Sequence, residues 1–172
     1  LGPLAIGYSH QTLLPQLVEE QYGRGIGLMG LLQSVGAIGG LGGGLFIASR
    51  REVSYKGRLM LLAALSYGIA LLGFAGANHM WMAFPLIIWI GASQTLFRAG
   101  NTATLMEIAP DRLRGRIISA TLLDTALSPI AGLAAGLTAD LWGVSYGYIL
   151  LSAACLSVVV VTMLIYPKIK DV

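Results

Sequence analysis

Residues 25–49 read GIGLMGLLQSVGAIGGLGGGLFIAS and contain no charged side chain. Similar stretches follow along the chain: residues 59–97 and 141–167 are uncharged, and residues 117–139 carry only Asp124. A bilayer core about 30 Å thick is crossed by about 20 apolar residues of helix. The sequence therefore predicts an integral membrane protein that is built from membrane-spanning helices.

The overall composition supports a membrane location. The chain is 56% hydrophobic and only 11% charged, whereas soluble domains carry about 25% charged residues. The net charge of +3 does not indicate a nucleic-acid partner, because the charges sit in short clusters between apolar runs. The single cysteine, Cys155, excludes an internal disulfide and a cysteine-based zinc site.

We predict one all-α domain over residues 1–172, a six-transmembrane-helix bundle. Backbone groups in lipid must be satisfied internally, so each apolar segment is expected to be helical. The first segment is short, because Glu19 and Glu20 follow it, and we expect it to be truncated in a chain that is part of a longer protein. The predicted spans are residues 1–17, 25–49, 58–77, 80–107, 115–139 and 145–166.

The positions of the basic residues predict the orientation in the membrane. Nine Lys and Arg residues lie in the linkers after the second and fourth spans and in the C-terminal tail, while the alternate linkers contain only Arg24. Basic residues concentrate on the cytoplasmic side of membrane proteins. The C-terminus is therefore predicted to be cytoplasmic.

A short pattern recurs 92 residues apart: residues 38–45 read IGGLGGGL and residues 130–137 read IAGLAAGL. The predicted orientation has the second span running inward and the fifth running outward. The six spans then divide into two inverted three-helix repeats, an arrangement found in many secondary transporters. The alternative is a chance match, since Gly, Ala and Leu dominate this chain.

Glycines recur at four-residue intervals in both copies of this pattern. Such spacing lets helix backbones approach closely in a membrane. The glycines are predicted to form a helix-packing interface, either within this bundle or, as we favour from their number in the second span, against a partner bundle outside the chain. The interface residues are Gly36, Gly40, Gly44, Gly132 and Gly136.

Two charged residues lie well inside predicted spans. A charge at the centre of a membrane helix costs about 2.5–3.5 kcal/mol on insertion scales, so it normally faces a partner or water. Arg98 lies 13 residues before Asp111 in the connecting turn, and Asp124 lies 13 residues after it. With 1.5 Å of rise per residue the two charges have similar depth on adjacent helices. We predict an Arg98–Asp124 pair with a role in coupling; the alternative is that each separately snorkels or lines water.

Polar residues at helical spacing identify candidate cavity-lining positions: Gln94 and Asn101 in the fourth span, and His10 and Gln11 in the first. His10 is a candidate proton carrier, because histidine usually titrates near physiological pH; alternatively, it is only hydrogen-bonded near a helix end. The sequence shows no constellation of acid, base or metal ligands. We therefore predict no enzyme activity, no cofactor and no metal site.

The segment Pro110–Arg116, PDRLRGR, is followed by Pro129, Gly132, Gly136 and the sequence DLWG at 140–143. These residues resemble the tenth-to-eleventh span region of the major facilitator superfamily. Nearly the whole chain resembles the C-terminal half of that family, spans seven to twelve, and is most similar to its drug and siderophore exporter branch. The cytoplasmic turn is then formed by Asp111, Arg112, Arg114, Gly115 and Arg116.

This resemblance implies a twelve-span protein of the bacterial cytoplasmic (inner) membrane that works by alternating access, commonly as a proton-driven antiporter. The first and fourth spans here would line the central cavity, and the second and fifth would face the other half. One family feature is missing: Ala48 stands where an acidic residue is expected after Gly44.

The sequence thus predicts secondary transport of a small molecule, as proton-coupled efflux, by the C-terminal half of a longer transporter. The expected partners are the lipid bilayer, a missing N-terminal six-helix half or a second copy of the chain, the small-molecule substrate, and protons. Two alternatives remain open: a half-size transporter that dimerises, and a membrane scaffold domain that does not transport.

Overall fold

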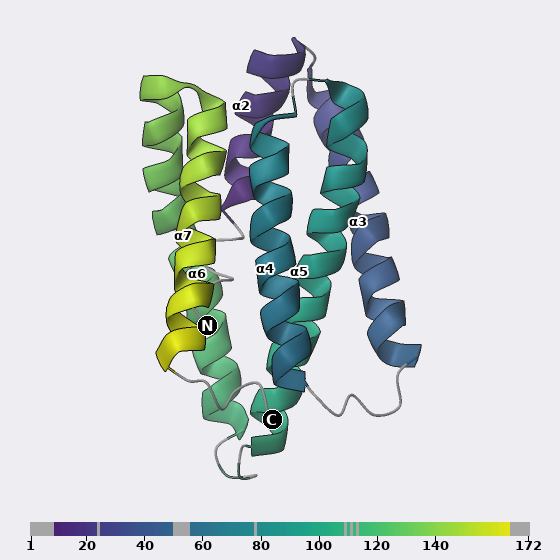
Figure 1. Cartoon of the computed structure of the whole chain (residues 1–172), viewed down its shortest axis with the longest axis vertical. Coiled ribbons are helices and arrows are strands. Elements are labelled where there is room, and N and C mark those ends of the chain that lie inside the picture. Colours follow the sequence, from purple (N-terminus) through teal and green to yellow (C-terminus); the bar gives the residue numbers. More distant parts are fainter. Residues whose placement is uncertain are drawn as a thin grey trace.

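The computed structural model describes residues 9–23, 25–49, 56–77, 79–108, 110, 112 and 114–165. In these residues the regular structure is helical. Figure 1 shows the helices side by side, with the C-terminal ends of α3 and α5 at the same end of the bundle as the N-terminal ends of α4 and α6. The helices are α2 (His10–Tyr22), α3 (Ile26–Ser49), α4 (Lys56–Ala75), α5 (Met80–Ile108), α6 (Arg114–Trp142) and α7 (Val144–Ile165).

Four of these helices are long and apolar enough to cross a membrane: Gly27–Ser49, Gly57–Ala75, Met80–Met106 and Val144–Ile165. Helix α2, with 13 residues, is shorter, and α6 is less apolar than the other long helices. The described structure fits the predicted α-helical membrane protein.

Helix α2 extends beyond the predicted end of the first span at residue 17. It continues to Tyr22 and ends at Gly23, whose φ of 57° is left-handed and whose N–H donates to Glu19 O. Glu20 does not end the helix; its Oε2 accepts a hydrogen bond of 3.2 Å from the N–H of Val144, the first residue of α7. A carboxylate at a helix N-terminus satisfies an unpaired N–H and is attracted by the positive end of the helix dipole. The acidic end of α2 therefore joins it to α7.

The main core contains residues of all six described helices, most of them on α2, α4 and α7. Its centre contains the fully buried Leu71, Phe74 and Tyr148. The rings of Phe74 and Tyr148 meet edge to face, with centroids 5.3 Å apart and an angle of 66° between their planes. A second, smaller cluster lies toward the other end of α4 and includes Leu61 and Phe97.

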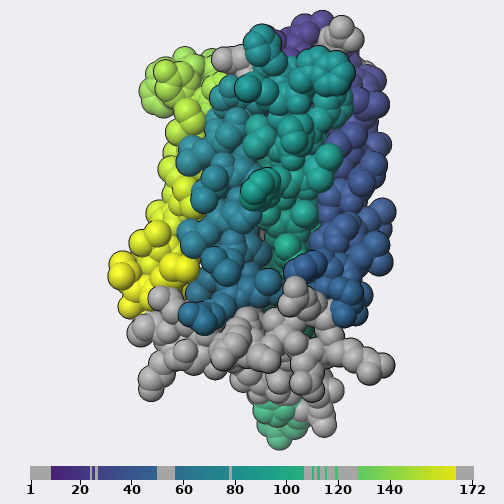
Figure 2. Space-filling model, turned by 45° about the vertical axis from the view of Figure 1, so that its right-hand side comes forward, coloured from purple at the N-terminus to yellow at the C-terminus, as the bar shows by residue number. Residues whose placement is uncertain are grey.

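Helices α3 and α5 approach each other so closely that backbone meets backbone. A methyl group added at Gly39 would collide with the carbonyl of Ile88, and one added at Gly43 would lie 2.7 Å from the carbonyl oxygen of Ala92. From the other side, a methyl group at Gly91 would collide with the carbonyl of Gly36. Figure 2 shows α5 between α3 and α4 on one face of the molecule.

The contact between α3 and α5 predicts a specific sensitivity to added methyl groups. Gly39→Ala must push the two helices apart, and overpacking of this kind costs about 1–3 kcal/mol. We expect a lower midpoint of thermal unfolding for the detergent-purified protein, followed by tryptophan fluorescence. Gly42→Ala is the matched control, because nothing lies within 4 Å of a methyl group at Gly42. Equal unfolding midpoints for the two variants would contradict this packing.

Candidate functional site

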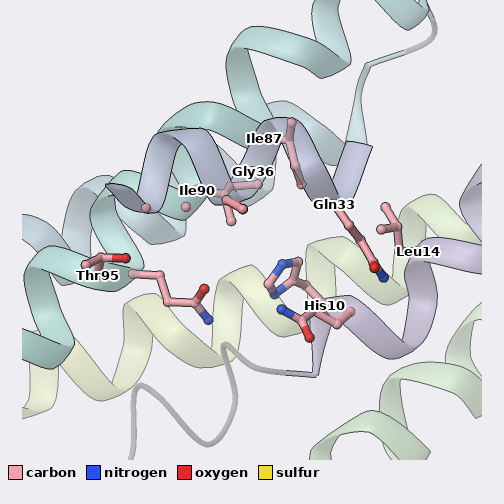
Figure 3. A pocket seen from close by; sticks show the side chains of 12 residues that line it. His10, Leu14, Gln33, Gly36, Ile87, Ile90 and Thr95 are labelled. Carbon is pink, nitrogen blue, oxygen red and sulfur yellow. The ribbon is translucent and has the colours of Figure 1, made fainter. Parts of the chain in front are cut away.

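A cavity of about 240 Å³ lies between α2, α3 and α5. In Figure 3 the imidazole of His10 lies between Thr95 on one side and Gln33 with Leu14 on the other, across from Ile87 and Ile90. The described lining has apolar walls, hydrogen-bonding side chains and no carboxylate. Its residues are His10, Gln11, Leu14, Gln33, Gly36, Ala37, Gly40, Ile87, Ile90, Gly91, Gln94 and Thr95.

His10 begins α2 and is held by two neighbouring helices. Its Nδ1 is 3.0 Å from the hydroxyl of Tyr67 on α4, and its carbonyl oxygen accepts a 3.0 Å hydrogen bond from the hydroxyl of Tyr148 on α7. The side chain is buried although it lines the cavity. His10 is thus hydrogen-bonded near a helix end, as one of the two alternatives from the sequence expected. Its ring is also the titratable group of the described lining.

Three carboxamides from three helices reach the same cavity: Gln11 from α2, Gln33 from α3 and Gln94 from α5. Gln11 and Gln33 are exposed, whereas Gln94 is partly buried. The Nε2 atom of Gln94 is buried and has no hydrogen-bond partner among the described residues. Buried polar groups without partners are rare, because each one costs about 1–3 kcal/mol. A residue of the cavity lining thus carries an unsatisfied donor.

A glycine on the neighbouring helix determines how the Gln94 segment packs. A methyl group at Gly40 would lie 3.0 Å from Thr95 Oγ1, so Thr95 occupies the space that the missing side chain leaves on α3. The same contact occurs elsewhere in the bundle: a methyl group at Gly132 on α6 would lie 3.0 Å from the hydroxyl oxygen of Thr12 on α2. Both threonines follow a cavity-lining glutamine in the chain.

Three predicted site residues lie away from the described cavity lining or outside the described side chains. Arg98 is exposed and lies one helical turn beyond Gln94 on α5. Asn101 is partly exposed still further along α5 and does not line the cavity. The side chain of Asp124 lies outside the described residues, so its pairing with Arg98 stays a prediction.

The predicted packing glycines contact helices of this chain. Gly36 faces Ile87, Gly40 faces Thr95, and Gly44 lies near the methyl group of Thr95. On α6, Gly132 faces Thr12, while nothing lies within 4 Å of a methyl group at Gly136. The structure thus places the glycines of α3 against α5, inside the bundle, and not on the outward face that we favoured. The difference arises because glycine spacing identifies a close contact but not the helix that makes it.

The predicted cytoplasmic turn is only partly visible. Arg112 and Gly115 are exposed. Asp111 and the side chains of Arg114 and Arg116 lie outside the described residues. Among the described residues, no group of three or more His, Cys, Asp or Glu side chains is placed to hold a metal ion.

Sequence reasoning missed Thr95, Tyr67 and Tyr148. Thr95 could have been found, because Gln11-Thr12-Leu13 recurs as Gln94-Thr95-Leu96. The two tyrosines give no such signal, since their partner His10 is more than 50 positions away in the chain.

Comparison with known proteins gives a clear similarity. The chain is 26% identical over 167 residues to the Staphyloferrin A transporter of Staphylococcus aureus (strain NCTC 8325 / PS 47). This match covers 97% of the present chain but only 42% of that relative, so the chain spans less than half of its length. No protein-family model and no solved structure matches the chain. The apolar helices and the similarity to a transporter fit an integral membrane protein.

The hydrogen bond from Tyr148 on α7 to His10 on α2 leads to a prediction about stability. Tyr148→Phe removes the buried hydroxyl that donates to His10 O, and the loss of one such hydrogen bond costs about 0.5–1.5 kcal/mol. The midpoint of thermal unfolding in detergent should fall. Tyr146→Phe is the matched control, because Tyr146 lies on the same helix and is exposed. A Tyr148→Phe protein as stable as the control would show that this hydrogen bond does not hold α2 in place.

Proposed function

We propose that this chain is the C-terminal half of a secondary transporter that moves a small molecule across the membrane by alternating access. The observation that carries the proposal is the match of nearly the whole chain to less than half of a transporter. The described bundle adds a polar cavity between membrane helices, which is where transporters bind substrate. A substrate of the kind carried by the relative, staphyloferrin A, is the starting hypothesis.

The helix packing supports two inverted repeats, α2–α4 and α5–α7. In these repeats α2 corresponds to α5, α3 to α6 and α4 to α7. The contact of α3 with α5 then corresponds to the contact of α6 with α2, and the contact of α4 with α5 corresponds to that of α7 with α2. All four pairs of helices are in contact. The packing of α4 on α7 maps onto itself. Two contacts lack counterparts of similar extent: that of α6 with α7, which corresponds to α3 with α4, and that of α2 with α3, which corresponds to α5 with α6. The equivalent Gly40–Thr95 and Gly132–Thr12 contacts also fit this exchange.

The outward faces of α3 and α6 support a second half. The large residues of the repeated pattern are 57–70% exposed, unlike the glycines Gly39, Gly43 and Gly132, which contact neighbouring helices: Ile38, Leu41 and Leu45 on α3, and Ile130, Leu133 and Leu137 on α6. We propose that these two equivalent apolar faces lie against the missing N-terminal half, which the longer relative has the length to contain. A second copy of the chain is the competing occupant of the same faces.

Proton coupling and efflux complete the proposal. His10 is the titratable side chain of the described cavity lining, so it is the candidate site at which a proton is bound and released during the cycle. Its hydrogen bond to Tyr67 joins that event to α4. The basic linkers would then face the cytoplasm of a bacterium, and export would run against the inward flow of protons.

Transport itself can be measured with the full-length protein in proteoliposomes. An imposed pH gradient should drive movement of staphyloferrin A, and a protonophore should abolish the gradient-driven part. His10→Gln should keep a residual flux but lose the response to the gradient. Vesicles without protein are the control. Flux that is equal with and without the gradient would rule out proton coupling, and no flux above empty vesicles would rule out this substrate.

The proposed charge pair can be tested by exchange. Arg98→Asp and Asp124→Arg should each strongly reduce flux, because each leaves two like charges within the membrane. The double variant restores opposite charges and should recover part of the activity. Double-mutant comparison isolates the interaction between the two sites. Undiminished flux in Arg98→Ala would show that Arg98 has no role in coupling.

A further inference from the structure

The unsatisfied donor of Gln94 indicates the chemistry of the ligand that the cavity binds. Its Nε2 is buried and lacks a partner among the described residues, while the side chain lines a cavity that is large enough for part of a ligand. A buried N–H group needs an acceptor to offset the loss of its hydrogen bonds to water. A ligand that brings an acceptor atom to this donor, with a small shift of the Gln94 side chain, would offset that cost.

The charged and polar groups of the lining further restrict the class of ligand. The described lining contains no carboxylate, so a cationic ligand would find no counter-charge in it. The polar groups that it does contain are three carboxamides, the Thr95 hydroxyl and the His10 imidazole, all of which can donate a hydrogen bond. This combination suits oxygen acceptors, whether neutral or negatively charged, and disfavours cations.

The packing fixes where these donors lie. Thr95 fits against Gly40, and Thr12 fits against Gly132, at the same separation. Because the glutamine precedes the threonine in both helices, each glycine contact holds a glutamine in an equivalent place, Gln94 on α5 and Gln11 on α2. The two carboxamides reach one cavity from two different helices. One ligand in the cavity can therefore be bound by side chains of both helices.

We propose that the cavity recognises an oxygen-rich small molecule, whose carboxylate or carbonyl oxygens accept hydrogen bonds from Gln94 Nε2 on α5 and from Gln11 on α2. This inference rests on the proposed transport function and names the chemical class of its substrate. Recognition depends on hydrogen-bond donors, not on an acidic residue, so lipophilic cations are poor ligands for this site.

The test uses the full-length protein in nanodiscs and measures binding of staphyloferrin A at pH 7.5 by calorimetry. Gln94→Leu removes the donor and should weaken binding by about 10-fold. Gln94→Glu keeps the size of the side chain but replaces the donor with a carboxylate, and should weaken binding more strongly. Gln16→Leu is the matched control on α2, since Gln16 is bonded to Glu20 and Asp140 and does not line the cavity. Tetraphenylphosphonium, a lipophilic cation, should not compete.

The outcomes separate this inference from the function on which it rests. If Gln94→Leu and Gln94→Glu bind staphyloferrin A as tightly as the wild-type protein does, the proposed transport function is retained and the recognition assigned to Gln94 is wrong. Displacement by tetraphenylphosphonium would likewise overturn the ligand class. If the wild-type protein does not bind staphyloferrin A, the proposed substrate fails and the inference falls with it. Unchanged unfolding midpoints in both Gln94 variants show that any loss of binding is local.

Discussion

The close contact between α3 and α5 is the constraint on which the rest of the bundle depends. Lipid provides no hydrophobic force between helices, so their association depends on packing and on hydrogen bonds. At Gly39 and Gly43 the backbone of α3 lies directly on that of α5. The neighbouring Gly36, Gly40 and Gly91 line the cavity. Small residues thus serve two purposes: they bring the two backbones together, and Gly36, Gly40 and Gly91 also line the cavity.

The two repeated elements have the same framework but different polar groups. Gln11-Thr12 and Gln94-Thr95 make equivalent contacts, yet the residue before each differs: His10 in α2 and Ser93 in α5. Both of these residues bond to α4, His10 to Tyr67 and Ser93 to Ser66, whose hydroxyl oxygens are 3.0 and 3.1 Å from their partners. Only the first element carries a histidine, a side chain type that commonly serves as a proton carrier. The proposed asymmetry of function, proton binding in one repeat and not in the other, therefore depends on one residue within a shared pattern.

Much of the helical organisation could be predicted from the sequence, because uncharged runs of about 20 residues in so apolar a chain are typical of membrane-spanning helices. The cavity positions of His10, Gln11 and Gln94 were also accessible, since polar residues in apolar helices seek other polar groups or water. The direction of the glycine face of α3 was not. Every face of such a helix is apolar, so periodicity cannot tell a neighbour within the chain from one outside it. The contacts of Tyr67 and Tyr148 depend on distant segments and leave no local pattern.

The central claim is that the cavity between α2, α3 and α5 is opened alternately to the two sides of the membrane. The most direct measurement places a cysteine at Gln94, in a full-length protein whose buried Cys155 is replaced by serine, and labels it with a membrane-impermeant thiol reagent from either side of oriented vesicles. The account predicts labelling from both sides, in proportions that shift when a pH gradient is applied. Labelling from neither side, or from one side alone under every condition, would contradict it.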